Sequence, residues 1–309
     1  MSYITIRNLL ADGRPITLDG GIGTEMLRRG VRWRQHGIED APEVVRQVHS
    51  DYLAAGADVI TAHTFNLTST NFINFFRDRE HMAEIGAPAL ETKAQELCAL
   101  AVGLARDALR TSGKEGRVPV AGSISPVQHP FRPDLAPDRA ACADHHARCV
   151  QVLAECGVDL IFFEAMNNLA ELRVAVRAGN SSGLPVWVSL IPDAAGTLLS
   201  GESLREAGNI ARTEGAAAVL LATAPADVVT RGLPAILNGG PAGAQAIIGR
   251  YNPPSWKPDF YPQFVDTDDT PPRRYAEAAR AWRQAGATII GGSSGTTPAH
   301  IAAVKQAIG

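Results

Sequence analysis

Four segments of the chain repeat one pattern, which constrains the fold more than any other feature. Each contains the end of an amphipathic helix, a glycine, a small or acidic residue, and a short apolar run that ends in small or polar residues. The segments are residues 53–64, 153–164, 212–223 and 283–294. Their glycines, at positions 56, 157, 215 and 286, stand where a left-handed residue ends a helix at little cost only when it lacks a side chain. The pattern predicts a repeated helix–strand unit.

The apolar runs are typical of parallel strands that are buried on both faces. With the remaining runs included, we predict eight strands, at residues 15–19, 58–64, 118–122, 158–164, 185–190, 216–221, 245–249 and 288–291. Helical patterns separate them, for example at residues 42–55, 89–109, 138–156 and 273–285. A chain of 309 residues suits an α/β fold with a single (β/α)8 TIM barrel, which needs about 250 residues plus loop insertions. No G-x-G-x-x-G motif follows the first strand, which disfavours a dinucleotide-binding fold. We therefore expect one barrel domain over residues 1–309.

Charge and hydropathy exclude several classes of partner. The net charge of −3 would not steer the protein to nucleic acid or to an anionic membrane. No apolar run approaches the roughly 18 residues of a membrane span, and residues 1–15 lack the basic-then-apolar composition of a signal peptide. We expect a cytoplasmic protein that binds neither nucleic acid nor membrane. The sequence leaves the oligomeric state open, a homo-oligomer included.

Cysteines and histidines on the predicted helices favour structural roles. Cys142, Cys149 and Cys156 recur every seven residues, so they share one stripe of a helix. This spacing favours packing in the core over a metal or redox role. His49 is interpreted as structural, and His145 and His146 are expected to face solvent.

In a barrel of this type the active site lies at the carboxyl ends of the strands, where the following loops converge. The residues that this rule selects are Asp19, His63, Thr64, Ser123, Ser125, Glu164, Ala222, Tyr251, Asn252, Ser293 and Ser294. Long loops at residues 65–88 and 250–272 are interpreted as coverings of the site. Phe65, Tyr251 and Trp256 are candidates for an aromatic wall that would attract a sulfonium or quaternary ammonium group.

Several segments resemble the homocysteine S-methyltransferase family. They are residues 19–25 (DGGIGTE), residues 42–49 with 52–58, residues 120–123, Glu164 with Asn168 and Glu171, and residues 291–301 (GGSSGTTPAHI). They follow the family's order over essentially the whole chain. The resemblance implies a barrel enzyme that moves a methyl group from a sulfonium, betaine or folate donor to the thiol of homocysteine.

The resemblance also implies a zinc ion that is held by three cysteine thiolates and binds the substrate thiol. The matching positions here are Ala222, Ser293 and Ser294, and none is cysteine. Alanine offers no ligand and neutral serine hydroxyls bind zinc poorly. We therefore expect no metal at this site and no cofactor. His63 and Glu164 are the candidate catalytic residues, because either could act as a general base in place of the metal.

The family places groups that hold the substrate's amino and backbone atoms at the ends of its first and fourth strands, where this chain has Asp19 and Glu164. The further candidates for substrate binding are Glu25, Thr64, Ser123, Asn168, Tyr251, Ser293 and Ser294. Glu25 could equally be a carboxylate in the first turn of a helix. Ser293 and Ser294 lie on a glycine-rich turn into a helix, where exposed N–H groups can bind a carboxylate.

Three hypotheses follow. The first is a zinc-independent methyltransferase with a small-molecule methyl donor and acceptor, in which an amino-acid-like or sulfonium or betaine metabolite gives or takes the methyl group. The second keeps the barrel but makes it a metal-free lyase or hydrolase, with His63 and Glu164 as acid and base. The third is a homologue that binds a ligand without turnover.

Overall fold

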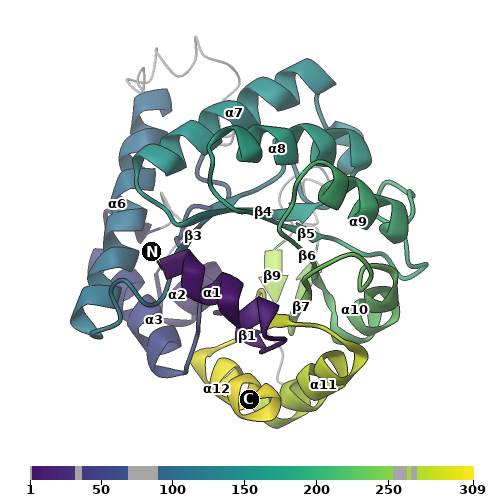
Figure 1. Cartoon of the computed structure of the whole chain (residues 1–309). Helices are drawn as coiled ribbons and strands as arrows, with labels where there is room; N and C mark the ends of the chain where they lie inside the picture. The colour runs from purple at the N-terminus through teal and green to yellow at the C-terminus, as the bar shows by residue number, and fades with distance from the viewer. Residues whose placement is uncertain (1, 32–36, 69–89, 253–262, 266–269) are drawn as a thin grey trace.

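The computed structural model describes residues 2–31, 37–68, 90–252, 263–265 and 270–309 (Figure 1). Eight parallel strands form one sheet in the order β1-β10-β7-β6-β5-β4-β3-β2. Their bounds are β1 Ile16–Thr17, β2 Ile60–Thr61, β3 Val120–Ile124, β4 Leu160–Met166, β5 Val186–Leu190, β6 Ala218–Pro225, β7 Ala242–Ile247 and β10 Ile289–Gly292. The eight predicted strands are confirmed.

The two ends of this sheet meet, which makes it a barrel. Leu18, directly after β1, forms a parallel bridge with Val59 beside β2. The Asp58 amide donates to the Thr17 carbonyl at 2.8 Å, and the Thr17 amide donates to the Asp58 carboxylate at 2.9 Å. On its other side β1 pairs with β10 through Ile16 and Ile289. The expected (β/α)8 architecture is confirmed.

Helices surround the strands on the outside (Figure 1). They are α2 Ile22–Arg28, α3 Pro42–Ala54, α6 Leu90–Thr111, α7 Arg139–Glu155, α8 Leu169–Ser181, α9 Leu204–Thr213, α10 Ala226–Gly232, α11 Pro272–Ala285 and α12 Pro298–Ile308. As the repeated pattern predicted, the glycines that follow α3, α7, α9 and α11 all have positive φ, between 80° and 114°. Short 3-10 turns lie at Pro133–Leu135 and Leu233–Ala235.

Apolar side chains fill the inside of the barrel and the space between strands and helices as two separate clusters. The inner cluster contains Leu18, Phe162, Trp187, Leu220 and Ile289. The rings of Phe162 and Trp187 meet edge to face, with centroids 6.2 Å apart. Residues that alternate with these along the strands belong to the outer cluster. Because side chains alternate along a strand, cluster membership identifies which positions face the barrel interior.

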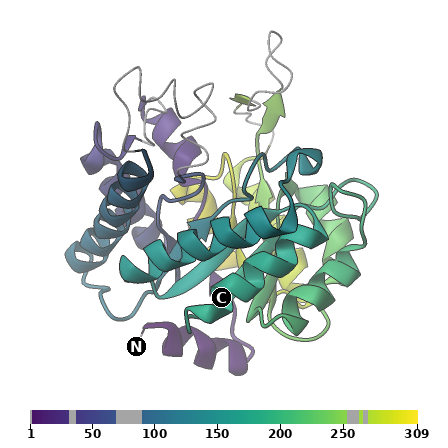
Figure 2. The same ribbon diagram turned by 90° about the horizontal axis from the view of Figure 1, so that it is seen from above.

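A helix that the sequence pattern did not predict, α1 (Ser2–Ala11), closes one end of the barrel. Ile6 of this helix is buried in the inner cluster. The Trp187 indole N–H donates to the Tyr3 hydroxyl at 3.0 Å. Figure 2 shows α1 at one end of the molecule and the short hairpin of β8 (Arg250–Asn252) and β9 (Gln263–Val265) at the other. The carboxyl ends of the strands therefore open on the side away from α1.

Several strand bounds differ from expectation: β2 covers only Ile60–Thr61 of the predicted residues 58–64, and β6 ends four residues after the predicted residue 221. β7 was predicted at residues 245–249 and starts three residues earlier. Its first residues, Ala242-Gly243-Ala244, lack the β-branched side chains that mark a strand in sequence. Gly243 lies against Leu220 and Ile289, where a Cβ atom would collide. The close packing of neighbouring strands thus selects small residues here.

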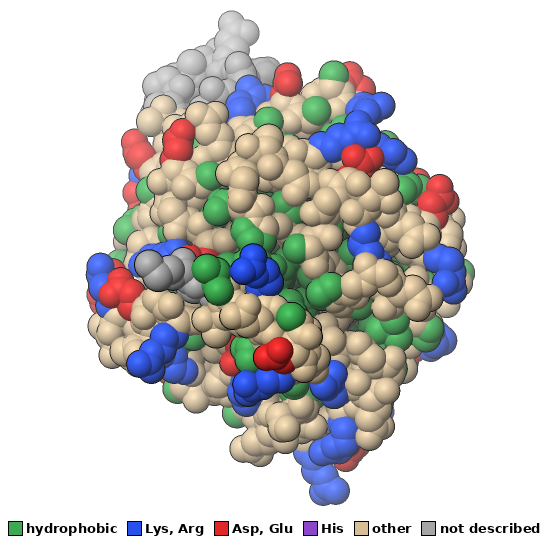
Figure 3. All heavy atoms as spheres, in the orientation of Figure 1, with side chains coloured by type: hydrophobic (Ala, Val, Ile, Leu, Met, Phe, Trp, Pro, Cys, Tyr) green, Lys and Arg blue, Asp and Glu red, His purple; other side chains and the backbone are tan. Residues whose placement is uncertain are grey.

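The face that carries α1 has a mixed surface charge. Basic and acidic side chains are interspersed around its rim (Figure 3). This distribution suits a chain whose net charge is only −3. Within the described part of the chain, no helix is long and apolar enough to cross a membrane.

Candidate active site

One layer of inward-facing residues separates the apolar barrel core from the open end. All but one stand two positions after a residue of the inner cluster and so face the same way. The exception, Gln245, stands two positions after Gly243, which packs against Leu220 and Ile289 of that cluster. This layer, which we call the mouth layer, comprises Thr61, Ser123, Glu164, Ser189, Ala222 and Gln245. Asp19 joins it from the end of β1. The expected polar site at the carboxyl ends of the strands is therefore present.

Asp19 is buried, with 2% of its surface exposed, and bonds to the neighbouring strand. Its carboxylate accepts hydrogen bonds from the Thr61 amide at 2.6 Å and the Thr61 hydroxyl at 2.9 Å. Burial raises the pKa of Asp19 to about 8, although both bonds from Thr61 oppose the rise, and the nearby Glu164 charge adds to it. With this pKa the Asp19 carboxyl group is largely protonated at pH 7, and a bound cation would favour its ionised form.

Glu164 lies on β4 and is only partly exposed. The Ser123 hydroxyl donates to its Oε1 at 2.5 Å. Burial raises the pKa of Glu164 to about 7, and the bond from Ser123 limits the rise. The next residue, Ala165, has a φ of 62° and donates its amide to the Ser189 hydroxyl at 3.0 Å. The pairing of β4 with β5 shifts register at this point.

Together the two carboxyl groups give the mouth layer its chemistry. Within the described residues, neither Asp19 nor Glu164 forms an ion pair with lysine or arginine. No lysine or arginine in the described part of the chain therefore balances the charge of either ionised group. Such a pair favours a cationic ligand, because a nearby positive charge stabilises both ionised forms. A pKa near 7 also lets one carboxyl group exchange a proton with a substrate.

His63 and Thr64 follow β2, and both are buried. The Thr64 hydroxyl donates to the Ser123 carbonyl at 2.8 Å and accepts from the Ser123 amide at 3.0 Å. The Thr64 side chain thus replaces a backbone partner beyond the end of β2 and continues the hydrogen bonding to β3. It also holds Ser123 beside Glu164. Its hydroxyl is engaged in this link. The roles predicted for His63 in catalysis and Thr64 in substrate binding stay predictions.

The carboxyl ends of β6, β7 and β10 lie side by side, as expected for neighbouring parallel strands of the barrel. Ala222 is in register with Gln245, and Gln245 with Gly291. The Ser293 amide donates to the Ala246 carbonyl at 3.1 Å. Directly after Ala222, Thr223 has a φ of 60°, a strained conformation for a β-branched residue. The pairing of β6 with β7 shifts register at this point.

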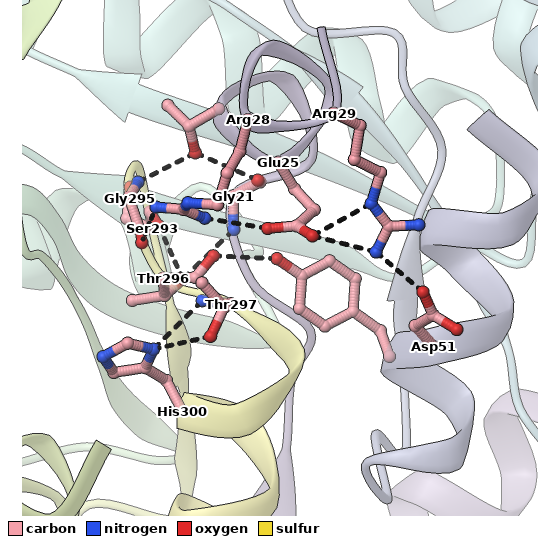
Figure 4. Close-up of polar contacts among 12 residues, drawn as sticks. Gly21, Glu25, Arg28, Arg29, Asp51, Ser293, Gly295, Thr296, Thr297 and His300 are labelled. Carbon is pink, nitrogen blue, oxygen red and sulfur yellow. Dashed lines mark hydrogen bonds and ion pairs between the residues drawn. The ribbon is translucent and has the colours of Figure 1, made fainter. Parts of the chain in front are cut away.

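A hydrogen-bond network ties the loop after β10 to the loop after β1 (Figure 4). The Gly21 amide donates to the Thr296 hydroxyl at 3.2 Å, which in turn donates to the Ser293 carbonyl at 2.6 Å. The Tyr52 hydroxyl donates to the Thr296 carbonyl at 2.9 Å. A Cβ atom at Gly20 would lie 2.6 Å from the Thr296 hydroxyl, so this approach requires glycine. The network fixes Ser293 and Ser294, both half-buried, at the rim of the barrel.

Glu25, a predicted substrate ligand, lies in this region but bonds to arginines. Its carboxylate binds Arg28 and Arg29, each at 2.8 Å, and Arg29 also binds Asp51 at 2.7 Å. Figure 4 shows the Glu25 carboxylate lying between the two guanidinium groups. Its negative charge is thus compensated within the protein. Substrate binding by Glu25 stays a prediction.

Asn168, another predicted substrate ligand, caps α8. Its side-chain oxygen accepts from the Glu171 amide at 2.9 Å, and its amide group donates to Asn167 at 2.9 Å. The described residues include the backbone of Tyr251 in β8 but not its side chain or Trp256, so the proposed aromatic wall lies largely outside them. The same holds for most of the two loops interpreted as coverings.

The two histidines expected to face solvent on α7 are buried, so that expectation is wrong. His146 Nε2 lies 3.0 Å from the Glu171 carboxylate, and His145 Nε2 lies 3.5 Å from the Cys149 sulfur. Helix α8 packs on α7, and its Glu171 contacts the His146 ring, which the period of α7 alone does not reveal. His49 is fully buried, as its structural interpretation requires.

The expected packing role of the cysteine stripe is confirmed. Cys142 lies in a small apolar cluster, and Cys149 and Cys156 pack against the outer core. Burial raises the pKa of the Cys142 and Cys149 thiols to about 12. Both thiols are therefore protonated at neutral pH.

Sequence reasoning missed three members of the mouth layer, namely Thr61, Ser189 and Gln245. A signal was available for Ser189 and Gln245, since each is a polar residue within a strand of otherwise apolar residues.

Comparison with known proteins assigns the chain to a family. The family model described as homocysteine S-methyltransferase matches residues 16–308. The chain belongs to the homocysteine S-methyltransferase family. It is 28% identical to homocysteine S-methyltransferase 4 of Zea mays, over 94% of this chain and 88% of that protein. It is 30% identical to selenocysteine methyltransferase of Astragalus bisulcatus over 65% of each protein.

A solved structure supports the fold. The homocysteine methyltransferase MmuM of Escherichia coli, in its metallated form, has a TM-score of 0.77 to this chain at 23% identity, covering 98% of this chain and 99% of the other. Family membership makes the protein a methyltransferase, as expected from the sequence.

The residues present do not fit the zinc site that the family resemblance implies. Ala222 lies near the end of β6, and Ser293 and Ser294 follow β10; both strands pair with β7. The three residues offer only two neutral hydroxyl groups. All four cysteines lie on or directly after helices α6 and α7, away from the mouth layer. In the described part of the chain, no group of three histidine, cysteine, aspartate or glutamate side chains could hold a metal ion.

Proposed function

We propose that this homocysteine S-methyltransferase homologue moves a methyl group from a sulfonium or betaine donor to the thiol of homocysteine or a similar small amino acid without thiolate-bound zinc. One barrel domain over residues 1–309 would perform the whole reaction. The observation that supports this proposal most is the pair Asp19 and Glu164, whose carboxyl groups have raised pKa values beneath a rim that lacks thiolates.

Binding of the amino acid begins at its ammonium group. Asp19 and Glu164 form no ion pair with lysine or arginine among the described residues, and the charge of Glu164 raises the pKa of Asp19. An ammonium group between them would replace that repulsion by two attractions. The Thr61 and Ser123 hydroxyls hold the two carboxyl groups in place for this contact.

Activation of the thiol then requires a base. A free alkyl thiol with a pKa near 8.5 is only a few per cent ionised at pH 7, and full ionisation needs roughly 2 kcal/mol. In the proposed step His63, the other candidate base, accepts the thiol proton, because Glu164 holds the ammonium group. The sulfur electron pair forms a bond to the donor's methyl carbon as the bond to the donor's sulfonium or ammonium atom breaks. The donor leaves as a neutral thioether or amine.

The test is turnover with defined compounds. We would incubate the protein with L-homocysteine and either S-methyl-L-methionine or glycine betaine, and measure methionine by mass spectrometry. Glu164→Gln should lower the rate at least tenfold, whereas Glu155→Gln on the exposed end of α7 should leave it unchanged. Equal rates for both variants would remove Glu164 from the mechanism.

Independence from zinc needs a separate measurement. Protein purified without chelators should contain far less than one equivalent of zinc by elemental analysis, and dialysis against a chelator should leave its activity unchanged. Near-stoichiometric zinc, or loss of activity that returns when zinc is added, would contradict the proposal.

A second candidate is a ligand-binding homologue without turnover, and one observation favours it. Ala222 stands where the family resemblance implies a cysteine, and its methyl side chain can perform no chemistry. A thermal-shift panel of L-homocysteine, L-methionine, S-methyl-L-methionine and glycine betaine distinguishes the two. Stabilisation without any methylated product would favour the silent homologue.

A further inference from the structure

Gln245 occupies the inner wall of the barrel at the level where the site lacks its thiolates. Its neighbours in β7, Ala244 and Ala246, belong to the outer apolar cluster, so Gln245 faces the interior. Gly243, two residues earlier, lies against Leu220 and Ile289 of the inner cluster, which confirms this direction. Gln245 is in register with Ala222 on one side and Gly291 on the other.

Within the described part of the chain, the side-chain amide of Gln245 lacks the hydrogen bond that its buried oxygen needs. Its side chain is 3% exposed, and its Oε1 atom is buried without a hydrogen-bond partner among the described residues. Burying an unsatisfied carbonyl group costs free energy, and an apolar residue of similar shape would avoid that cost. The rest of β7 consists of alanine, glycine and isoleucine. A lone, unsatisfied amide in such a strand points to a ligand rather than to packing.

We propose that Gln245 is a specificity-determining residue that accepts a hydrogen bond from the reactive end of the substrate. The proposal rests on the proposed function, in which Asp19 and Glu164 hold the ammonium end of an amino acid. The substrate class is then an α-amino acid whose side chain ends in a proton-bearing heteroatom, such as a thiol or a hydroxyl group. Ala222, in register with Gln245, contributes only a methyl group beside the amide.

This arrangement distinguishes substrate from product. Before transfer, the substrate heteroatom carries a hydrogen that the Gln245 carbonyl accepts. After transfer a methyl group replaces that hydrogen, and the carbonyl is left unsatisfied again. Product binding is weakened as a result, which favours its release without a separate conformational step.

The experiment compares four amino acids that share the ammonium and carboxylate groups and differ at the end of the side chain. They are L-homocysteine, L-homoserine, L-methionine and L-norvaline, and calorimetry gives the dissociation constant of each. We expect the wild-type protein to bind L-homoserine and L-homocysteine at least about fivefold more tightly than L-norvaline. Gln245→Leu should reduce this preference to less than about twofold.

Two controls separate a ligand contact from a structural role. Gln151→Leu, at an exposed position on α7, should keep the wild-type preference. The melting temperature of Gln245→Leu without ligand should equal or exceed that of the wild type, because the substitution removes an unsatisfied buried group. If Gln245→Leu fails to fold, Gln245→Ala gives the same comparison of ligands.

The outcomes are distinct. An unchanged preference for L-homoserine and L-homocysteine in the Gln245 variants would overturn the role of Gln245 while leaving the proposed function intact. If none of the four amino acids binds to the wild type, the proposed function fails and this inference fails with it. A lower melting temperature with the preference retained would show that Gln245 serves the fold.

Discussion

The Ser123 hydroxyl donates a hydrogen bond of 2.5 Å to Glu164 Oε1, joining the inward faces of β3 and β4. The bond stabilises the ionised carboxylate and so limits the rise in its pKa that burial causes. Ser123 is itself held by two hydrogen bonds to the Thr64 hydroxyl. Three strands therefore contribute to the protonation state of one acid.

Removing this bond should shift the pH dependence of turnover. With Ser123→Ala, the pKa of Glu164 should rise further, and the acidic limb of the rate profile should move to higher pH by roughly half a unit to one unit. The measurement is kcat/KM for methyl transfer between pH 5.5 and 9. An acidic limb that stays in place, with a uniformly lower rate, would mean that Ser123 does not tune Glu164.

Asp19 should make the folded protein less stable as pH rises. Its pKa is about 8 when folded and about 3.9 when unfolded, so the unfolded chain binds fewer protons between these values. Stability from this group is full below about pH 4 and declines by up to about 1.4 kcal/mol per pH unit until pH 8. Asp19→Asn should therefore gain stability relative to the wild type between pH 5 and 8, measured by urea unfolding. A constant difference across this range contradicts the prediction.

His49 should have the opposite effect at acidic pH. It is fully buried, both of its ring nitrogens are without a partner among the described residues, and burial lowers its pKa to about 4. The unfolded chain, with a histidine pKa near 6.5, binds more protons between pH 4 and 6.5, so stability falls as pH decreases through that window. His49→Phe should flatten this fall by about 1 kcal/mol per pH unit. Parallel unfolding curves for variant and wild type from pH 7 to 4.5 would disprove it.

The helix that closes the barrel offers a matched pair of isoleucines. Ile6 is 1% exposed in the inner cluster, whereas Ile4 on the same helix is 50% exposed. Ile6→Ala should lower the free energy of unfolding by about 2–5 kcal/mol, and Ile4→Ala by less than about 0.5 kcal/mol. Chemical denaturation of both variants tests the docking of α1. Similar small losses for both would mean that α1 is not packed on the barrel.

Restoring the missing ligands should create a metal site. Strand β7 pairs with both β6, which carries Ala222, and β10, which Ser293 and Ser294 follow. The triple variant Ala222→Cys, Ser293→Cys, Ser294→Cys should bind about one zinc ion, because three thiolates and water form a favoured coordination set. Elemental analysis of the wild type and the variant, prepared identically, gives the result. Equal zinc contents would show that the three positions do not form a site in the folded protein.

The sequence by itself determined the order and nature of the barrel elements. Glycine after each of four helices, followed by an apolar run, is a local requirement of helix termination and strand burial, so it can be recognised without the fold. Asp19 and Glu164 were identifiable because a strand end in such a barrel is a functional position. The replacement of the expected cysteines at Ala222, Ser293 and Ser294 is likewise plain from the sequence.

Only the tertiary structure decided how these residues act. The raised pKa of Asp19 depends on burial and on the charge of Glu164, which is 145 positions away in sequence and close only in the folded barrel. Burial of His146 follows from the packing of α8 on α7, where Glu171 contacts its ring. The unsatisfied amide of Gln245 emerges only once its neighbours on β6 and β10 are in place. Hydrogen-bond satisfaction and desolvation are set by what surrounds a group in space, and local sequence does not specify those surroundings.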